Sequence, residues 1–321
     1  MATKTKFEVK LGAATREAFG RELVELGRAN QDIVVCDADL SKSTMTVYFA
    51  KEFPDRFISC GIAEADMVAI GAGLAYGGKI PVVSSFSAFV INKGFEQLRV
   101  AVAYPKLNVK VVGTHSGISI GEDGPSQMSV EETGLACSLP GFVVISPADE
   151  LSCRALFREA VNHNGPVFVR TGRPKCPILY TADQKFEIGK AVELADGKDV
   201  TVIANGLLVA QAMIAADMLD AEGISVRVVD MHTVKPIDRD AIRKAATETG
   251  AIVVAEEHLV DGGLGVRVAQ VVAETAPVPM EFVGIQDTYA ESGQPEELLE
   301  KYGLVAKDVA AAIRKVAGRK R

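Results

Sequence analysis

The sequence predicts an α/β protein made of two doubly wound domains. Short apolar runs rich in valine and isoleucine alternate with longer segments whose apolar residues recur at helical spacing, which is typical of parallel sheets covered by helices. The chain has 321 residues, an ordinary length for two domains, and 48% of them are hydrophobic. A charged, irregular stretch at residues 173–198 interrupts the alternation. We therefore expect one domain over residues 1–184 and a second over residues 185–321.

Each element in the first half follows from its local pattern. Phe19, Leu23 and Leu26 recur at helical spacing, and a small-residue helical segment is closed by Gly77 and Gly78. The predicted helices cover residues 14–29, 62–76, 91–103, 129–138 and 149–162. The predicted strands cover residues 32–36, 80–84, 109–113, 142–146 and 167–170. The second half repeats the pattern with strands at 200–204, 226–229, 252–255 and 283–285 and helices at 208–222 and 265–274.

A polar, glycine-rich loop follows the predicted strand at residues 109–113. Residues 114–132 read THSGISIGEDGPSQMSVEE and bring His115, Asp123 and Gln127 together among three glycines. Open α/β sheets bind ligands at the carboxyl ends of their strands, so this position favours a binding site over an ordinary Gly/Pro turn. The place of His115, directly after a strand, is typical of a hydrogen-bonding or proton-handling residue.

Other candidates each allow a structural and a functional interpretation. Glu64 begins an apolar, small-residue helix, where it is either a solvated first-turn carboxylate or a buried acid that holds or transfers a proton. Phe86 and Phe89 either cap the sheet as core residues or form a wall on which a flat heterocycle stacks. Residues at element ends can serve as caps or surface charges, or can converge on an anion. The candidates for anion binding are Arg16, Ser43 and Arg170.

Composition excludes several classes of function. With 35 basic and 42 acidic residues the net charge is −7, and the only basic run is at residues 319–321, so nucleic acid is not an expected partner. No apolar signal core or membrane span is visible, and we expect a cytoplasmic protein.

The sequence also lacks a P-loop, a GxGxxG after a strand, and a GDG followed by an Asn pair, so machinery that cradles a cofactor's phosphates is missing. Reduced, mostly buried thiols without bound metal are expected for Cys36, Cys60, Cys137, Cys153 and Cys176.

Read together, the candidate segments resemble transketolase, and specifically its C-terminal portion. GIAEADM at residues 61–67 is similar to the family's catalytic-glutamate segment, SSFSAF at 84–89 to its aminopyrimidine-stacking segment, and THSGISIGEDGPSQM at 114–128 to its most recognisable loop. The match continues in collinear order and spans essentially the whole chain. Its further segments are DADLS at 37–41, FVRT at 168–171, TVKPID at 233–238, EEH at 256–258 and AESG at 290–293.

The resemblance implies a thiamine diphosphate (ThDP) enzyme that transfers a two-carbon ketol unit from a phosphorylated ketose to an aldose. Glu64 would act catalytically by hydrogen-bonding the cofactor's aminopyrimidine, a role that requires a carboxyl able to hold a proton in a water-poor site. Phe86 and Phe89 would stack on that ring, and Asp39 would lie near the thiazolium end. The implied sugar-contacting residues are His115, which is also catalytic, Asp123 and Gln127. The implied phosphate-binding residues are Arg16, Ser43 and Arg170.

Two positions depart from part of the family. Gln127 stands where some transketolases have a second histidine and others have glutamine. Asn92 stands where many members have a third aromatic or a basic residue, which leaves the outer wall of the pyrimidine pocket undefined.

The resemblance also predicts that two separate chains together form the enzyme. Full-length transketolases add a domain that binds the diphosphate and Mg²⁺, so we expect this chain to be the C-terminal subunit of a split transketolase. It would be active only in an α₂β₂ assembly with an N-terminal subunit that holds Mg²⁺, and would bind no metal itself. The resemblance implies a donor from the pentose phosphate pathway or a less common sugar phosphate such as apulose 4-phosphate. Less favoured alternatives are a 2-oxo acid dehydrogenase beta subunit and a non-catalytic assembly subunit.

Overall fold

A seven-stranded sheet in the order β12-β6-β7-β5-β4-β2-β3 forms the centre of the first half of the molecule. The structure is a computed structural model that describes residues 7–320. All neighbours in this sheet are parallel except β12, which is antiparallel to β6. Every residue of β2, β5 and β7 is buried, as expected for valine-rich strands covered on both faces. The strands are β2 (Ile33–Asp37), β3 (Phe57–Ser59), β4 (Ile80–Phe86), β5 (Lys110–Thr114), β6 (Val143–Ile145), β7 (Val167–Arg170) and β12 (Thr233–Lys235).

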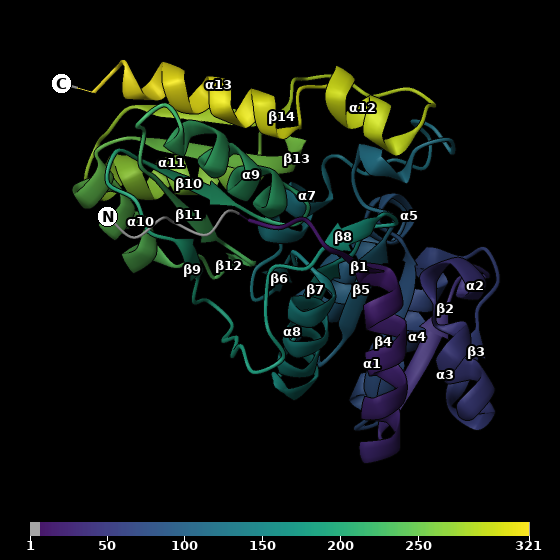
Figure 1. Ribbon diagram of the computed structural model, residues 1–321. Coiled ribbons are helices and arrows are strands. Elements are labelled where there is room, and N and C mark those ends of the chain that lie inside the picture. Colours follow the sequence, from purple (N-terminus) through teal and green to yellow (C-terminus); the bar gives the residue numbers. More distant parts are fainter. Residues whose placement is uncertain (1–6, 321) are drawn as a thin grey trace.

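Helices cover both faces of this sheet (Figure 1). One face packs against α1 (Thr15–Ala29), α3 (Val47–Glu52) and α8 (Glu150–Asn162). The carboxylate of Asp149 caps α8 by accepting the amide proton of Ser152 at 2.7 Å. The other face packs against α4 (Glu64–Tyr76), α5 (Ser87–Asn92), α6 (Phe95–Gln97), a π-helix η2 (Leu98–Ala103) and α7 (Glu132–Ser138). Short turns complete the half: α2 (Ser41–Thr44), η1 (Pro54–Arg56) and the 3₁₀ turn η3 (Ile118–Ile120).

The second half contains a five-stranded sheet in the order β14-β13-β10-β11-β9. Its strands are parallel except for β9, which is antiparallel to β11. The strands are β9 (Val192–Ala195), β10 (Val200–Ala204), β11 (Val226–Asp230), β13 (Ile252–Leu259) and β14 (Met280–Ile285). The helices are α9 (Leu208–Asp220), α10 (Arg239–Thr249), α11 (Leu264–Thr275), α12 (Pro295–Lys301) and α13 (Ala306–Ala317), the last running along β14 on the outer side (Figure 1).

The predicted class, α/β with parallel sheets in both halves, is confirmed, and several short elements were not predicted. The irregular stretch contains β8 (Lys175–Pro177), which pairs with β1 (Leu11–Ala14), and β9. Strands of three or four mixed residues carry too little periodicity to be predicted. The helix expected over residues 91–103 is broken into α5, α6 and η2. Helix α10 was also missed, although Asp238 caps its start and Gly250, with φ +66°, ends it.

The two halves share one core. Val144 and Phe168 of the first sheet belong to the same cluster of buried side chains as Ile203, Val254 and Leu264 of the second half. Strand β12 follows β11 in sequence but pairs with β6 of the first sheet, which joins the halves through backbone hydrogen bonds as well. Among residues 7–320 no helix has the length and apolar character that a membrane span requires.

Candidate functional site

The residues expected at the site gather at one edge of the first sheet. Asp39 follows β2, Phe86 ends β4 and His115 follows β5. Since β5, β4 and β2 are parallel neighbours, their carboxyl ends lie side by side.

Glu64 is a buried acid and not a solvated first-turn residue. Its side chain is 1% exposed at the start of α4. The hydroxyl of Ser85 donates to Oε1 at 3.1 Å, and the Lys93 ammonium lies 3.3 Å from Oε2. Lys93 is itself 52% exposed, so a surface cation reaches the buried carboxylate.

Phe86 and Phe89 form a stacked pair, with ring centroids 5.6 Å apart and planes inclined by 15°. Phe86 is buried, whereas Phe89 is only partly buried. The ammonium of Lys93 lies 4.5 Å from the Phe89 ring centroid. Lys93 therefore contacts both the ring and the carboxylate that the sequence assigned to the cofactor.

His115 has an uncommon backbone conformation, with φ +58° directly after β5. Nη1 of Arg16 lies 3.2 Å from its Nε2, and Oγ1 of Thr114 lies 2.9 Å from its Nδ1. Because arginine only donates, Nε2 must accept, so Nδ1 carries the hydrogen and donates to Thr114. Burial, with the charges of Arg16 and Arg173, lowers the pKa of His115 to about 3, so the imidazole is neutral at physiological pH.

Arg16 and Arg173 form a small cationic group around His115. Arg16 Nη1 donates to the carbonyl of Ser43 at 2.7 Å, while its buried Nε finds no hydrogen-bond partner among residues 7–320. Burial, followed by the charge of Arg173, lowers the pKa of Arg16. Arg173 donates to the carbonyl of Ile120 at 2.6 Å. A buried guanidinium N–H without an acceptor beside a second arginine favours an anion at this place.

Arg170 belongs to a different group. Its guanidinium is 7% exposed, and Nε donates to Glu132 Oε1 at 2.5 Å while Nη2 donates to the carbonyl of Glu257 at 2.7 Å. Burial alone would lower the pKa of Arg170, but the carboxylates of Glu132 and Glu257 outweigh burial and raise it. These contacts pair Arg170 with buried carboxylates, whereas Arg173, three residues later, acts electrostatically on Arg16 and His115.

The remaining predicted residues lie on the exposed side of the edge. Asp123 is exposed and pairs with Arg173 at 3.6 Å, and Gln127 accepts a hydrogen bond from the Ser126 hydroxyl at 2.5 Å. Asp39 is exposed and has φ +64°. Asn92 donates to Glu131 Oε1 at 2.8 Å, which gives this position a defined partner.

Asp37 supports the loop that carries Asp39 and Ser43, a role that sequence reasoning missed. The buried carboxylate accepts from the amide of Leu40 at 2.7 Å, and from the hydroxyls of Thr44 at 2.7 Å and Thr46 at 2.9 Å. The signal was available, because Asp37 is the last strand residue before a turn rich in hydroxyl side chains.

Thiols and metal-binding clusters contribute nothing to this edge. Burial raises the pKa of Cys36 to about 12 and that of Cys137 to about 11, so neither is a nucleophile at neutral pH. Within residues 7–320, no group of three His, Cys, Asp or Glu side chains is placed to hold a metal ion.

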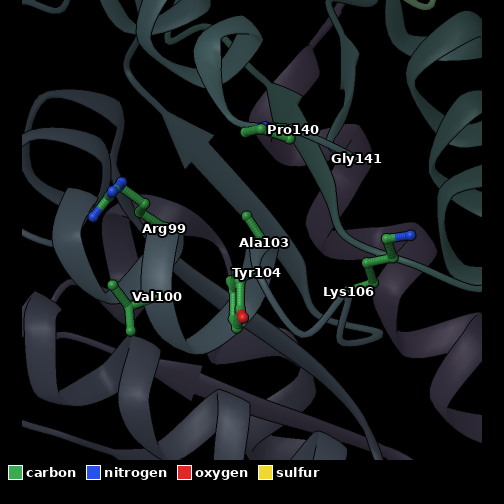
Figure 2. A pocket seen from close by; sticks show the side chains of 7 residues that line it. All are labelled: Arg99, Val100, Ala103, Tyr104, Lys106, Pro140 and Gly141. Atoms are coloured by element: carbon green, nitrogen blue, oxygen red, sulfur yellow. The ribbon is translucent and has the colours of Figure 1, made fainter.

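A separate pocket of about 470 Å³ has none of the predicted site residues in its lining (Figure 2). Val100, Ala103 and Tyr104 line it from η2 and its end, and Pro140 and Gly141 line it from the loop before β6. Its residues precede β5 and β6, so it lies at the amino ends of the strands, opposite the edge that carries His115.

Two family models match the chain. The transketolase pyrimidine-binding domain matches residues 12–177, and the transketolase C-terminal domain matches residues 189–309.

Three similar relatives are covered almost completely. A transketolase C-terminal section of Methanocaldococcus jannaschii is 43% identical over 301 residues, which are 93% of this chain and 94% of the relative. A 6-deoxy-6-sulfo-D-fructose transketolase subunit of Clostridium sp. strain MSTE9 is 40% identical over 98% of both chains. An apulose-4-phosphate transketolase subunit of Phocaeicola vulgatus is 41% identical over 91% of this chain and 93% of its own.

A solved structure agrees in sequence and in fold. A split-gene transketolase, described as an inactive β₄ tetramer, superposes with a TM-score of 0.91 at 49% identity and covers 97% of this chain and 100% of its own.

Proposed function

Because the chain belongs to the transketolase family, we propose that it is the C-terminal subunit of a split, ThDP-dependent transketolase. Together with a separate N-terminal subunit it transfers a two-carbon ketol unit from a phosphorylated ketose to an aldose. The observation that carries this proposal is one continuous edge of the sheet. Neighbouring strands and the helices between them bring three features together at this edge. They are the buried carboxyl of Glu64, the Phe86–Phe89 stack and the His115–Arg16 pair.

The residues present fit the aminopyrimidine half of ThDP. Glu64 offers a buried carboxyl that can hydrogen-bond the ring, and Ser85 donates to one of its oxygens. The partly buried ring of Phe89, which Lys93 contacts, offers a stacking surface. Asp39 lies on the turn that Asp37 stabilises, and we place it near the thiazolium end of the cofactor in this proposal. When bound, ThDP supplies the electron sink for cleaving the bond next to the ketose carbonyl.

The substrate's phosphate and hydroxyls are proposed to meet the rest of the edge. Arg16 and the Ser43 segment bind the phosphate, with Arg173 in the place that the sequence assigned to Arg170. His115 is neutral and keeps its Nε2 lone pair, so after Arg16 turns to the phosphate it can accept a hydrogen bond from a sugar hydroxyl. Asp123 and Gln127 contact further hydroxyls from the exposed side.

The partner chain is proposed to carry the diphosphate and Mg²⁺ site in an α₂β₂ assembly. This division is supported by the lack of a diphosphate motif in the sequence and by the match to 94% of a relative that is itself described as a C-terminal section. The inactive β₄ tetramer of the split-gene relative supports self-association of this type of chain.

The donor sugar has two supported alternatives to a pentose phosphate pathway intermediate. Relatives that act on apulose 4-phosphate and on 6-deoxy-6-sulfo-D-fructose are 41% and 40% identical to the chain. Phosphate and sulfonate are both tetrahedral anions that the cationic group around Arg16 can bind. The pathway and the cytoplasmic location stay predictions, as does the domain boundary near residue 185.

Reconstitution tests the proposal directly. The purified chain alone should show no ketol transfer, and mixing it with the N-terminal subunit, ThDP and Mg²⁺ should produce transfer from a ketose phosphate to an aldose phosphate. Transfer by a preparation shown by mass spectrometry to lack the partner would refute the split-subunit proposal. A screen of donors on the reconstituted pair would then identify the sugar.

A further inference from the structure

The glycines of the loop at residues 114–132 lie where the second half of the molecule approaches. A Cβ on Gly117 would lie 2.2 Å from the carboxylate of Glu257, and one on Gly124 would lie 2.5 Å from Oγ of Ser292. A Cβ on Gly121 would lie 3.0 Å from the ring of Pro295. All three glycines also have positive φ. The glycine spacing of this loop is therefore explained by contact with the C-terminal half.

The apolar side chains of the loop also pack into that half. Ile118, Ile120, Met128 and Val130 are buried in one cluster with the side chains that cover the second sheet. The amide of Leu259, at the end of β13, donates to the carbonyl of Val130 at 2.8 Å. Helix α12 packs against η3 in the same region (Figure 1). The loop is thus built on the C-terminal half, although it begins at β5 and ends at α7 of the first half.

Glu257 makes the polar contacts at the centre of this junction. Its Oε1 accepts the amide proton of Ser119 at 2.7 Å, and its carbonyl accepts from Arg170 Nη2 at 2.7 Å. Arg170 also binds Glu132, whose Oε2 accepts from the hydroxyl of Ser129 at 3.0 Å. One buried network therefore holds both the beginning and the end of the loop.

These contacts lie one to four residues from His115. The amide of Gly117 donates to the carbonyl of Ser129 at 2.7 Å, and the amide of Ser116 donates to the carbonyl of Thr171 at 3.2 Å. Conformations with positive φ at a non-glycine residue persist only where the surroundings hold them. The contacts around residues 116–119 supply that restraint for His115.

We propose that Glu257 of the C-terminal domain is a positioning residue of the active site, which fixes the loop so that His115 meets the sugar. The inference rests on the proposed ketol transfer for its kinetic consequence. It assigns to the C-terminal domain a direct part in shaping the substrate wall. The carboxylate of Glu257 accepts the hydrogen bond from Ser119, and its carbonyl is joined to Glu132 through Arg170.

Glu256 is a matched control for Glu257. It is the preceding residue, is equally buried and also accepts backbone N–H groups, from Leu264 at 2.7 Å and Gly265 at 2.8 Å. Those partners belong to α11 of the C-terminal domain and not to the loop. Glu256→Gln therefore perturbs the same strand without removing a hydrogen bond of the loop.

The kinetic experiment compares Glu257→Ala, Glu257→Gln and Glu256→Gln in the reconstituted complex. Glu257→Ala should lower kcat/KM for the ketose phosphate by ten- to a hundredfold, because small displacements of positioned groups are costly, with the ThDP Kd within about twofold of wild type. Glu257→Gln retains an acceptor for Ser119, so its kcat/KM should lie much closer to wild type than that of Glu257→Ala. Unchanged kinetics of Glu257→Ala, or an equal loss in Glu256→Gln, would overturn the proposal.

Hydrogen exchange on the isolated chain supplies a readout that needs no activity. Residues 115–121 should exchange faster in Glu257→Ala than in wild type and Glu256→Gln, while α4 and β4 stay protected. If Glu257→Ala does not fold, Glu257→Asp, which withdraws the carboxylate by one methylene, should show the same local effect. An inactive wild-type complex would count against the proposed function alone, whereas unaltered exchange at 115–121 would count against the positioning role.

Discussion

The imidazole of His115 lies against the ring of Phe86, with centroids 3.9 Å apart and planes inclined by 27°. Phe86 stacks in turn on Phe89, and Phe86 pairs in register with Thr114, the residue before His115. The aromatic wall proposed for the cofactor and the imidazole proposed for the sugar are therefore one continuous surface.

The Glu64→Gln variant tests whether this chain is a catalytic or a non-catalytic subunit. Glutamine preserves the shape of the side chain and an acceptor for Ser85 but cannot hold or release a proton. We expect kcat/KM of the reconstituted complex to fall by about 10²–10⁴-fold, the usual contribution of a proton-transferring side chain. Asp66→Asn, exposed on the same helical turn, should leave the rate unchanged. A rate for Glu64→Gln within twofold of wild type would support the non-catalytic alternative.

Arg173→Met tests the proposed anion group around Arg16. Loss of a charge-assisted hydrogen bond, about 1.5–3 kcal/mol, should raise KM for a ketose phosphate by roughly ten- to a hundredfold and leave KM for an unphosphorylated ketose nearly unchanged. Steady-state kinetics with both donors measures the difference. Arg243→Met, on the exposed face of α10, is the matched control. Equal effects on both donors would show that Arg173 does not bind the phosphate.

Arg170→Met should behave in a different way. It leaves the buried carboxylates of Glu132 and Glu257 without their cation, so we expect the free energy of unfolding to fall by about 3–5 kcal/mol. Chemical denaturation of the isolated chain measures this change. A stable Arg170→Met variant with a selective rise in KM for the phosphorylated donor would restore Arg170 to the phosphate site.

These two arginines show what the sequence could and could not reveal. The pattern of apolar runs predicted the parallel sheets, and the resemblance located Glu64, Phe86 and His115, which the structure brings to one edge. Both arginines lie in the same FVRTGR segment, and only their partners distinguish them. Glu257 comes from the other half of the chain, while Glu132 and Ile120 come from distant segments of the same half, and neither periodicity nor local motifs encode such contacts.

Lys93→Met tests whether Lys93 competes with the cofactor. Its ammonium lies 3.3 Å from Glu64 and 4.5 Å from the Phe89 centroid, the two groups proposed to hold the aminopyrimidine. Since a half-exposed ion pair contributes at most about 1 kcal/mol, its removal should tighten ThDP binding by no more than about fivefold. Calorimetric titration of the reconstituted complex measures the Kd, with Lys79→Met as the exposed control. Weaker ThDP binding by Lys93→Met would instead make Lys93 a cofactor ligand.

A buried acid between the two halves predicts how stability depends on pH. Asp230 ends β11, is fully buried, and accepts a hydrogen bond at 2.6 Å from the hydroxyl of Tyr180, which lies in the segment between the sheets. Burial raises the pKa of Asp230 from 3.8 to about 8. Between these values the folded chain holds a proton that the unfolded chain has released.

Because the folded state binds the extra proton, stability should fall as the pH rises through this window and level off above about pH 8. A difference of one bound proton between the folded and unfolded states gives the free energy of unfolding a slope on the order of 1 kcal/mol per pH unit. Asp230→Asn keeps an acceptor for Tyr180 and should remove the slope, so its stability relative to wild type should increase steadily from pH 5 to pH 8. Urea unfolding at fixed chain concentration measures both curves, with the exposed Asp240→Asn as control. Parallel curves for wild type and Asp230→Asn would mean that Asp230 is ionised in the folded chain.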